Sequence, residues 1–209
     1  MMKKYKKQLI LSSIVTLLPI LIGLFLWNRL PDTIATHFGS DNVANDWSSK
    51  PFVVFGLPLI LLGIHLFCLF TTMNDPKKKN ISEKMFRFIM WFVPVLSVFI
   101  LSFTYCYALG MDVNIGMGVN IIVGIVFLVI GNYLPKCKQN YTTGIKIPWT
   151  LNSTENWNRT NRLAGWLFMA GGILFFLNAF LQWSGMFLII IGIALLPIIY
   201  SFILYKKGI

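Results

Sequence analysis

The chain has few charged side chains, and acidic ones are the scarcest. Among its 209 residues only 7 are Asp or Glu, against 18 Lys or Arg, and charged residues make up 12% of the chain while 56% is hydrophobic. The mean hydropathy is +0.72. A soluble domain of this length would carry far more charge on its surface. The composition excludes such a domain and predicts an integral membrane protein.

Residues that could carry chemistry are scarce as well. The chain has two His and three Cys. Cys68, Cys106 and Cys137 show neither a disulfide framework nor a metal-ligand spacing. No Gly-rich phosphate loop and no nucleophile with an adjacent base is apparent. We therefore predict neither an enzyme nor a bound metal or cofactor.

Long apolar runs are what the chain has in abundance. About 20 apolar residues in a helix cross a hydrocarbon core of about 30 Å, because each residue rises about 1.5 Å. Runs such as LILLGIHLFCLF and IIVGIVFLVI are apolar on every side, which favours embedded helices over strands. We predict an all-α, polytopic membrane protein with six spans, at about residues 8–30, 51–73, 86–109, 113–134, 163–182 and 184–205.

The basic residues are distributed unevenly around these spans. Six spans place both termini on one side, and that side carries 16 of the 18 Lys and Arg residues. The other side carries only Arg29 and Lys50. By the positive-inside rule both termini and the long fourth loop are cytoplasmic. The net charge of +11 is thus a signal of topology, and we expect contact with membrane lipids and no direct contact with nucleic acid.

One ionisable side chain, His65, falls well inside a predicted span. Ion-coupled transporters generally place several charged groups at membrane depth despite their cost. The flanking residues of His65 are apolar, so we interpret this histidine as a neutral, hydrogen-bonded member of the helix bundle. The near absence of such groups argues against a coupled pump.

The first outer loop, residues 31–50, holds most of the acids of the outer side. It contains Asp32, Asp41 and Asp46 together with His37 and Trp47. The spacing of these residues matches no zinc or calcium motif. We interpret the segment as a turn-forming, solvated loop whose acidic side chains would attract a cationic extracellular ligand.

The fourth loop, residues 131–166, is the most polar part of the chain and reads GNYLPKCKQNYTTGIKIPWTLNSTENWNRTNRLAGW. A simple helix connection needs only about 2 to 8 residues. Asn152 and Glu155 have the spacing of a helix N-cap and its partner, which predicts a short helix from Ser153 with Trp157 on one side. The rings of Trp149 and Trp157 suit the membrane interface. The polar density exceeds what interfacial anchoring requires, so this loop is the main candidate for a site.

This loop resembles the signature of the SdpI family, bacterial immunity proteins against the sporulation-delaying killing factor and its relatives. The resemblance lies in the run G-N-x-L-P-x-x-K-x-N-Y-x-x-G-I-[KR]-x-P-W-T-L and in W-x-[RK]-T-x-[RK]-x-x-G. The site residues that it implies, for a partner or for signalling, are Asn132, Pro135, Lys138, Asn140, Gly144, Lys146, Pro148, Trp149, Thr150, Trp157, Arg159, Thr160, Asn161 and Arg162.

Two positions depart from the family pattern. The family usually has Arg where this chain has Lys146, which keeps the charge but lacks the planar fork of a guanidinium. It commonly has His where this chain has Asn161, which can donate and accept hydrogen bonds but does not titrate near neutral pH.

The resemblance also implies an organisation and a function. Residues 1–75 are similar to a DUF1648-like region, with the extracellular loop 31–50, and residues 84–209 form a four-helix SdpI-like unit. The implied function is resistance to a secreted, membrane-active peptide toxin at the bacterial plasma membrane. A further implied role is that of a receptor that holds a transcriptional repressor at the membrane. The expected toxin-facing residues are those of the outer loop: Asp32, His37, Asp41, Asp46 and Trp47.

Two other classes of protein stay open on the sequence alone. One is a transporter or channel for a small or amphipathic molecule, with Asn120, Asn178 and Gln182 along a path. The other is a membrane-embedded enzyme that uses residues 131–166.

Overall fold

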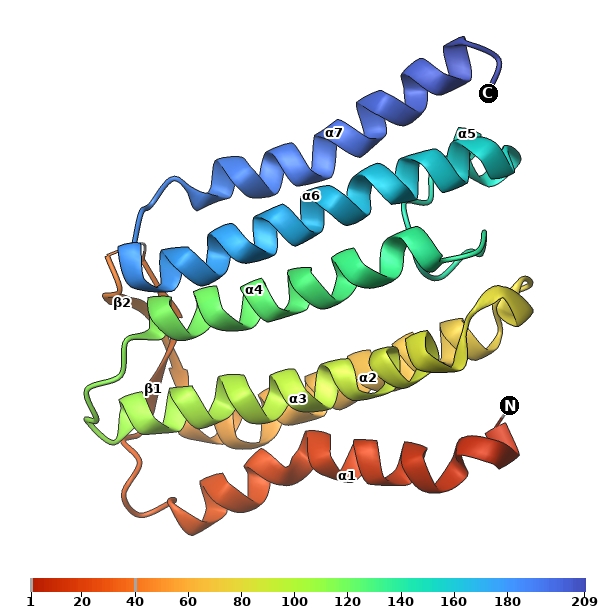
Figure 1. Cartoon of the computed structure of the whole chain (residues 1–209). Helices are drawn as coiled ribbons and strands as arrows, with labels where there is room; N and C mark the ends of the chain where they lie inside the picture. The colour runs from red at the N-terminus through yellow and green to blue at the C-terminus, as the bar shows by residue number, and fades with distance from the viewer. Residues whose placement is uncertain (1, 40) are drawn as a thin grey trace. The chain divides into compact units, whose positions relative to one another are not determined.

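The computed structural model describes residues 2–39 and 41–209 and is mainly helical (Figure 1). Its long helices are α1 (Met2–Phe25), α2 (Leu57–Met73), α3 (Glu83–Ala108), α4 (Ile115–Tyr133), α6 (Thr154–Leu181) and α7 (Met186–Lys206). Shorter elements are the strands β1 (Thr33–Phe38) and β2 (Ala44–Ser49), the π-helical turn Phe52–Gly56, the 3-10 turns Lys78–Asn80 and Leu134–Lys136, and α5 (Pro148–Asn152).

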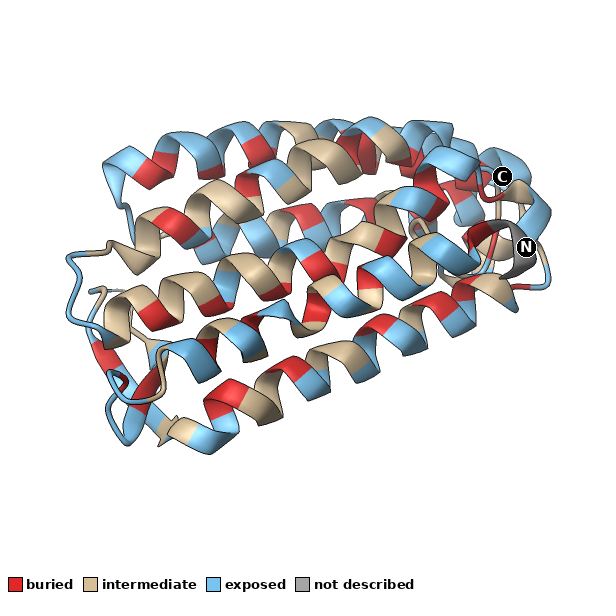
Figure 2. Ribbon diagram, turned by 90° about the horizontal axis from the view of Figure 1, so that it is seen from below, coloured by how far each residue is buried: buried red, intermediate tan, exposed pale blue. Residues whose placement is uncertain are grey.

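Six helices in the described part of the chain are long and apolar enough to cross a membrane. This confirms the predicted all-α, polytopic membrane protein. Figure 2 shows buried and exposed positions recurring along the helices. Large apolar side chains such as Phe67, Leu181 and Phe187 are exposed on helix surfaces, where lipid rather than water is the solvent.

The fifth span differs from its prediction because it continues into the polar loop. The predicted short helix and the predicted span are one helix, α6, and the N-cap is Ser153, whose side chain accepts a hydrogen bond from Asn156 N–H (3.2 Å). Asn152 is instead the last residue of α5. The prediction of Asn152 as the cap is therefore wrong by one residue.

The outer loop is more ordered than the predicted solvated turn. Its strands β1 and β2 pair antiparallel, with Ile34 opposite Ser48 and Ala35 opposite Trp47. Ile34 and Ala35 are buried, because Ile34 joins an apolar cluster that includes Val53 and Tyr105. The sequence does not indicate this hairpin, because polar residues make up at least half of each strand and do not alternate regularly with apolar ones.

Lys50 connects this hairpin to the end of α1. Its ammonium group donates to the carbonyl oxygens of Leu30 (2.8 Å) and Trp27 (3.3 Å) and pairs with Asp32 (3.1 Å). These bonds satisfy carbonyl groups in the turns that follow α1. Helix α1 ends at Phe25 and is followed by these turns, whereas the predicted span continued to residue 30.

The chain forms two compact units. The N-terminal unit contains the chain up to Met73 together with Phe86–Ile115, and the C-terminal unit contains Asn74–Met85 and Gly116–Ile209. This grouping by contacts places most of α3 with α1 and α2. The division into residues 1–75 and 84–209 rests on the family resemblance and stays a prediction.

A polar seam runs through the N-terminal unit. Ser12 and His65 share a hydrogen bond (Oγ to Nε2, 3.0 Å), and both side chains are fully buried. The Ser97 hydroxyl donates to the Thr16 carbonyl (2.8 Å), and the Tyr105 hydroxyl donates to the Pro19 carbonyl (3.1 Å). The bond to Ser12 agrees with our interpretation of His65 as a hydrogen-bonded bundle residue.

Helices α4 and α6 of the C-terminal unit approach each other at two pairs of glycines. A Cβ added to Gly131 would lie 2.8 Å from the Gly165 carbonyl oxygen, and one added to Gly172 would lie 2.8 Å from the Gly124 carbonyl oxygen. The backbones of the two helices are therefore in contact. Close backbone approach of this kind depends on small residues, and it sets where both ends of the polar loop lie.

We expect Gly131→Ala and Gly172→Ala each to lower the free energy of unfolding by about 1–3 kcal/mol, because the added methyl group forces α4 and α6 apart. Gly192→Ala in α7 is the matched control, since a Cβ there would meet no atom within 4 Å. Thermal unfolding of the purified variants in detergent measures their stability relative to the wild type. Equal stability of Gly172→Ala and Gly192→Ala would contradict the close contact.

Candidate functional site

The candidate site is the signature loop, which we define as residues 131–166, and Trp157 holds it together. The Trp157 side chain is fully buried, and its Nε1–H donates to the Cys137 carbonyl (2.7 Å). The bond joins the first turns of α6 to the segment that follows α4. Full burial does not fit an anchor at the membrane interface, since the Trp157 ring forms the core of the loop.

Asn161 lies one helical turn after Trp157 and fastens the middle of the loop. Its Oδ1 accepts from Ile145 N–H (2.9 Å), and its Nδ2 donates to the Trp157 carbonyl (2.9 Å). Gly144 adopts a φ of +107°, and a Cβ there would lie 2.8 Å from the Trp157 ring and from Asn161 Oδ1. Only glycine satisfies both constraints.

Asn140 shapes the turn between Cys137, which Trp157 holds, and Ile145, which Asn161 holds. Its buried Oδ1 accepts from the backbone N–H groups of Thr142 (2.8 Å) and Thr143 (2.7 Å), and its Nδ2 donates to the Lys138 carbonyl (2.8 Å). Asparagine is favoured in turns because its short amide reaches nearby backbone groups in this way.

The short helix α5 closes the loop against α7. Pro148 is its first residue, and the buried Thr150 hydroxyl accepts from Ile147 N–H (3.0 Å) and donates to the Ile145 carbonyl (2.8 Å). The Trp149 ring packs on Phe202 and Tyr205, with centroids 5.5 and 5.9 Å apart.

Thr160 supports a second buried contact between α6 and α7, which Asn156 makes with Ser201. Its hydroxyl donates to Asn156 Oδ1 (3.0 Å), which also accepts from the Ser201 hydroxyl (2.7 Å). Asn156 Nδ2 donates to the Ser201 carbonyl (3.0 Å). Sequence reasoning did not single out Asn156 as a site residue, because nothing in its spacing points to a partner 45 residues away.

The linker, which we define as residues 74–85, joins α2 to α3 and includes the first residues of α3. It supplies contacts that the sequence does not predict. The Asp75 carboxylate accepts from Tyr141 N–H (2.8 Å) and from the Thr142 hydroxyl (2.6 Å). The Lys77 ammonium donates to the Gln139 side chain, and Asn80 Nδ2 donates to the Gln139 carbonyl (2.7 Å). Gln139 Nε2 in turn donates to the carbonyl oxygens of Thr150 (2.9 Å) and Leu151 (2.8 Å).

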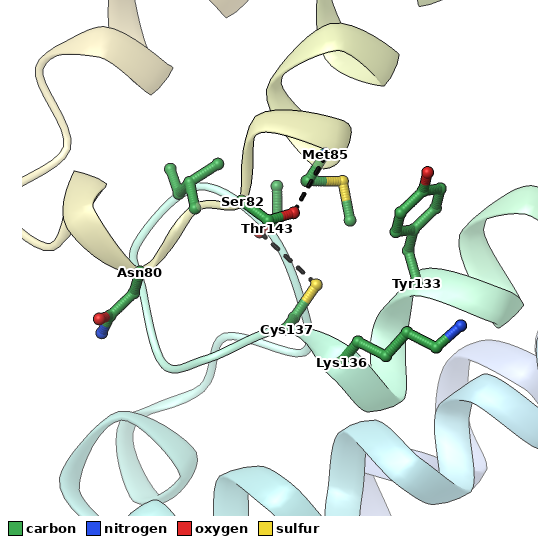
Figure 3. Close-up of a pocket in the computed structure, with 8 residues that line it drawn as sticks. Asn80, Ser82, Met85, Tyr133, Lys136, Cys137 and Thr143 are labelled. Atoms are coloured by element: carbon green, nitrogen blue, oxygen red, sulfur yellow. Dashed lines mark hydrogen bonds between the residues drawn. The ribbon is translucent and has the colours of Figure 1, made fainter.

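A small cavity of about 20 Å³ lies between the linker and the loop (Figure 3). Its walls include Ser82, Met85, Cys137 and Thr143, and its size suits about one water molecule. Burial raises the pKa of the Cys137 thiol, while a hydrogen bond from Thr143 opposes this shift. The thiol is therefore poorly suited to act as a nucleophile.

The remaining predicted residues lie on the surface of the loop. Asn132, Pro135, Lys138, Lys146, Arg159 and Arg162 are exposed. Arg159 pairs with Glu155 one turn earlier, and the Lys146 ammonium donates to the Thr142 carbonyl (2.8 Å). The loop thus combines a buried polar framework with a basic exterior.

The predicted outer-loop residues lie on the hairpin of the N-terminal unit. His37 hydrogen-bonds to the Asn45 side chain, Asp41 accepts from Val43 N–H (3.1 Å), and Asp46 accepts from Trp47 N–H (2.8 Å). All five candidates are exposed. Within residues 2–39 and 41–209, no group of three His, Cys, Asp or Glu could hold a metal ion.

We expect Asn161→Asp to destabilise the loop by roughly 2–3 kcal/mol, because a buried carboxylate accepts from Ile145 but cannot donate to the Trp157 carbonyl. Asn158→Asp is the control, since Asn158 is exposed on the same helix. Unfolding monitored by tryptophan fluorescence compares the two. Equal stability would show that Asn161 does not fasten the loop.

Comparison with known proteins gives matches at both ends of the chain. The SdpI/YfhL protein family matches residues 136–203, and a domain of unknown function, DUF1648, matches residues 14–62. The Immunity protein SdpI of Bacillus subtilis (strain 168) is 29% identical over 200 residues, which cover 93% of this chain and 92% of that protein. No solved structure matches the chain.

The two matched regions coincide with the two sites described above. The DUF1648 match contains the hairpin, and the SdpI/YfhL match contains most of the signature loop with α5, α6 and most of α7. Together with the six spans, these similarities identify a multi-pass cell-membrane protein in which residues 136–203 match the SdpI/YfhL protein family and residues 14–62 match DUF1648.

Proposed function

We propose that this protein is a membrane immunity protein that gives a bacterium resistance to a secreted, membrane-active peptide toxin. The observation that carries the proposal is the similarity to Immunity protein SdpI along 93% of the chain. The buried signature residues Asn140, Thr150, Trp157 and Asn161 support it, because they hydrogen-bond within one loop. Neither of the alternative classes has comparable support.

The outer hairpin is the surface that we propose for contact with the toxin. Asp41 and Asp46 are exposed there beside the exposed side chains of Val43 and Trp47. An apolar surface with negative charge suits a peptide that is both cationic and amphipathic. The Asp32 side chain is exposed as well, but its charge is offset by the pair with Lys50.

The basic exterior of the signature loop is the surface that we propose for a cytoplasmic partner, a transcriptional repressor. Lys138, Lys146 and Arg162 are exposed, whereas Asn140, Thr150 and Asn161 are buried and use their polar atoms within the loop. The exposed group would contact an acidic surface of the partner, and the buried group would hold that surface in shape.

Two of the three residues that the transporter alternative would place along a path, Asn120 and Asn178, hydrogen-bond within the protein. Asn178 Nδ2 donates to Asn120 Oδ1 (3.0 Å), and Asn178 Oδ1 accepts from Trp183 N–H (2.7 Å). Gln182 ends α6 in the left-handed conformation, with a φ of 51°. The Asn120 and Asn178 amides therefore bond within the protein, between α4 and the end of α6.

Expression of this chain in a toxin-sensitive bacterium should raise the dose of sporulation-delaying killing factor that the cells survive. Asp41→Asn with Asp46→Asn should reverse part of this gain, because two lost surface charges weaken binding by roughly 1 kcal/mol. Asp112→Asn is the matched control, since Asp112 is exposed in another loop of the predicted outer side. Survival at a fixed membrane abundance is the measurement. Cells that die at the same dose with and without the wild-type chain would refute the immunity function.

The repressor role has a separate test. A fluorescent fusion of a regulator encoded beside this protein should move to the membrane when the toxin is added. Lys138→Glu with Lys146→Glu should leave it in the cytoplasm, because like charges now face an acidic partner. Lys206→Glu, an exposed charge change outside the signature loop, is the control. A regulator that stays cytoplasmic with the wild-type protein would remove the signalling role while leaving the immunity function intact.

A further inference from the structure

Asp75 is a buried acid outside the signature loop that the proposed function does not yet use. Its side chain is 3% exposed. One carboxylate oxygen accepts from Lys77 N–H (2.7 Å), and the other accepts from Tyr141 N–H (2.8 Å) and from the Thr142 hydroxyl (2.6 Å). Burial of a carboxylate costs several kcal/mol unless donors surround it. The three donors therefore fix the linker and the loop relative to each other.

The contacts of Asp75 continue into the exposed part of the loop. Thr142, which donates to Asp75, also offers its carbonyl to the Lys146 ammonium (2.8 Å). Lys77, which lies two residues after Asp75, donates to the Gln139 side chain. Gln139 Nε2 in turn donates to the carbonyl oxygens of Thr150 and Leu151 in α5. A shift of the linker would thus move both the basic surface and α5.

The linker is also the covalent connection between α2 and α3. It follows Met73, the last residue of α2, and includes Glu83, the first residue of α3. Any displacement of these two helices must therefore pass into residues 74–85.

We propose that Asp75 is a positioning residue that couples the linker to the signature loop, so that a displacement of α2 or α3 changes the conformation of Tyr141–Lys146. The inference rests on the proposed function for its biological meaning, since the toxin would supply the displacement. A ligand shifts such an equilibrium only by binding two arrangements with different affinity. The bonds of Asp75 are the ones that would break between the two arrangements.

The first experiment needs no toxin. Hydrogen exchange of the purified protein is followed at the Tyr141 amide, which bonds Asp75, and at the Ile145 amide, which bonds Asn161. Asp75→Asn should speed exchange at Tyr141 about tenfold or more, because the NH₂ group of Asn cannot accept a hydrogen bond and its one oxygen must serve three donors. Exchange at Ile145 should stay unchanged. Lys79→Ala, an exposed change in the same linker, should leave both amides as in the wild type.

The outcomes of this experiment separate coupling from folding. Faster exchange at Tyr141 alone supports the proposal, and unchanged exchange at Tyr141 in Asp75→Asn overturns it. Faster exchange at both amides would indicate general destabilisation by Asp75→Asn. In that case the milder variant Thr142→Val, which removes one donor to Asp75, is measured instead. Faster exchange at Tyr141 alone in Thr142→Val supports the proposal, and any other result overturns it.

The second experiment adds the sporulation-delaying killing factor peptide to the protein in lipid nanodiscs. The wild type should change its exchange rate at Tyr141, and Asp75→Asn should lose this response. A response that persists in Asp75→Asn, or a wild type that binds the peptide without any response, overturns the coupling. If the wild type neither binds the peptide nor protects cells, the proposed function fails, while the first experiment still decides the structural role of Asp75.

Discussion

The hydrogen bond from the Trp157 indole to the Cys137 carbonyl is the contact on which the signature loop depends. It ties the start of α6 to the chain that leaves α4, and the buried ring leaves room only for a glycine at position 144. Asn161, one turn further along α6, can then reach the Ile145 amide. The loop is thus built on the first two turns of α6, which carry both Trp157 and Asn161.

The glycine contacts between α4 and α6 set the distance that this arrangement requires. Gly131 and Gly165 stand at the two ends of the loop, where backbone contacts backbone. A wider separation would draw Cys137 away from Trp157, because Cys137 lies shortly after Gly131 and Trp157 lies shortly before Gly165 along the chain. The two glycines of the signature therefore act through helix packing, and the polar residues between them act through hydrogen bonds.

The sequence predicts the spans well and the contacts of the loop poorly, for physical reasons. A run of about 20 apolar residues can only be a span in this chain, so all six were found. The hairpin was missed because its strands TIATHF and ANDWSS alternate weakly. The cap was placed at Asn152 because Asn and Ser are both good caps, and only backbone geometry distinguishes them. Asp75 and Gln139 were missed because their partners lie far away along the chain.

The structure also shows what is required at the two positions that depart from the SdpI family pattern. Position 161 needs one acceptor toward Ile145 and one donor toward the Trp157 carbonyl. A neutral imidazole supplies one of each, as the Asn amide does, so the family's usual His and this chain's Asn161 meet the same requirement without a titrating proton. Lys146 makes a single bond to the Thr142 carbonyl and points its charge outward. One donor is enough there, so the bidentate fork of Arg is not needed to hold the loop, and what both residues share is a positive charge on its exposed surface.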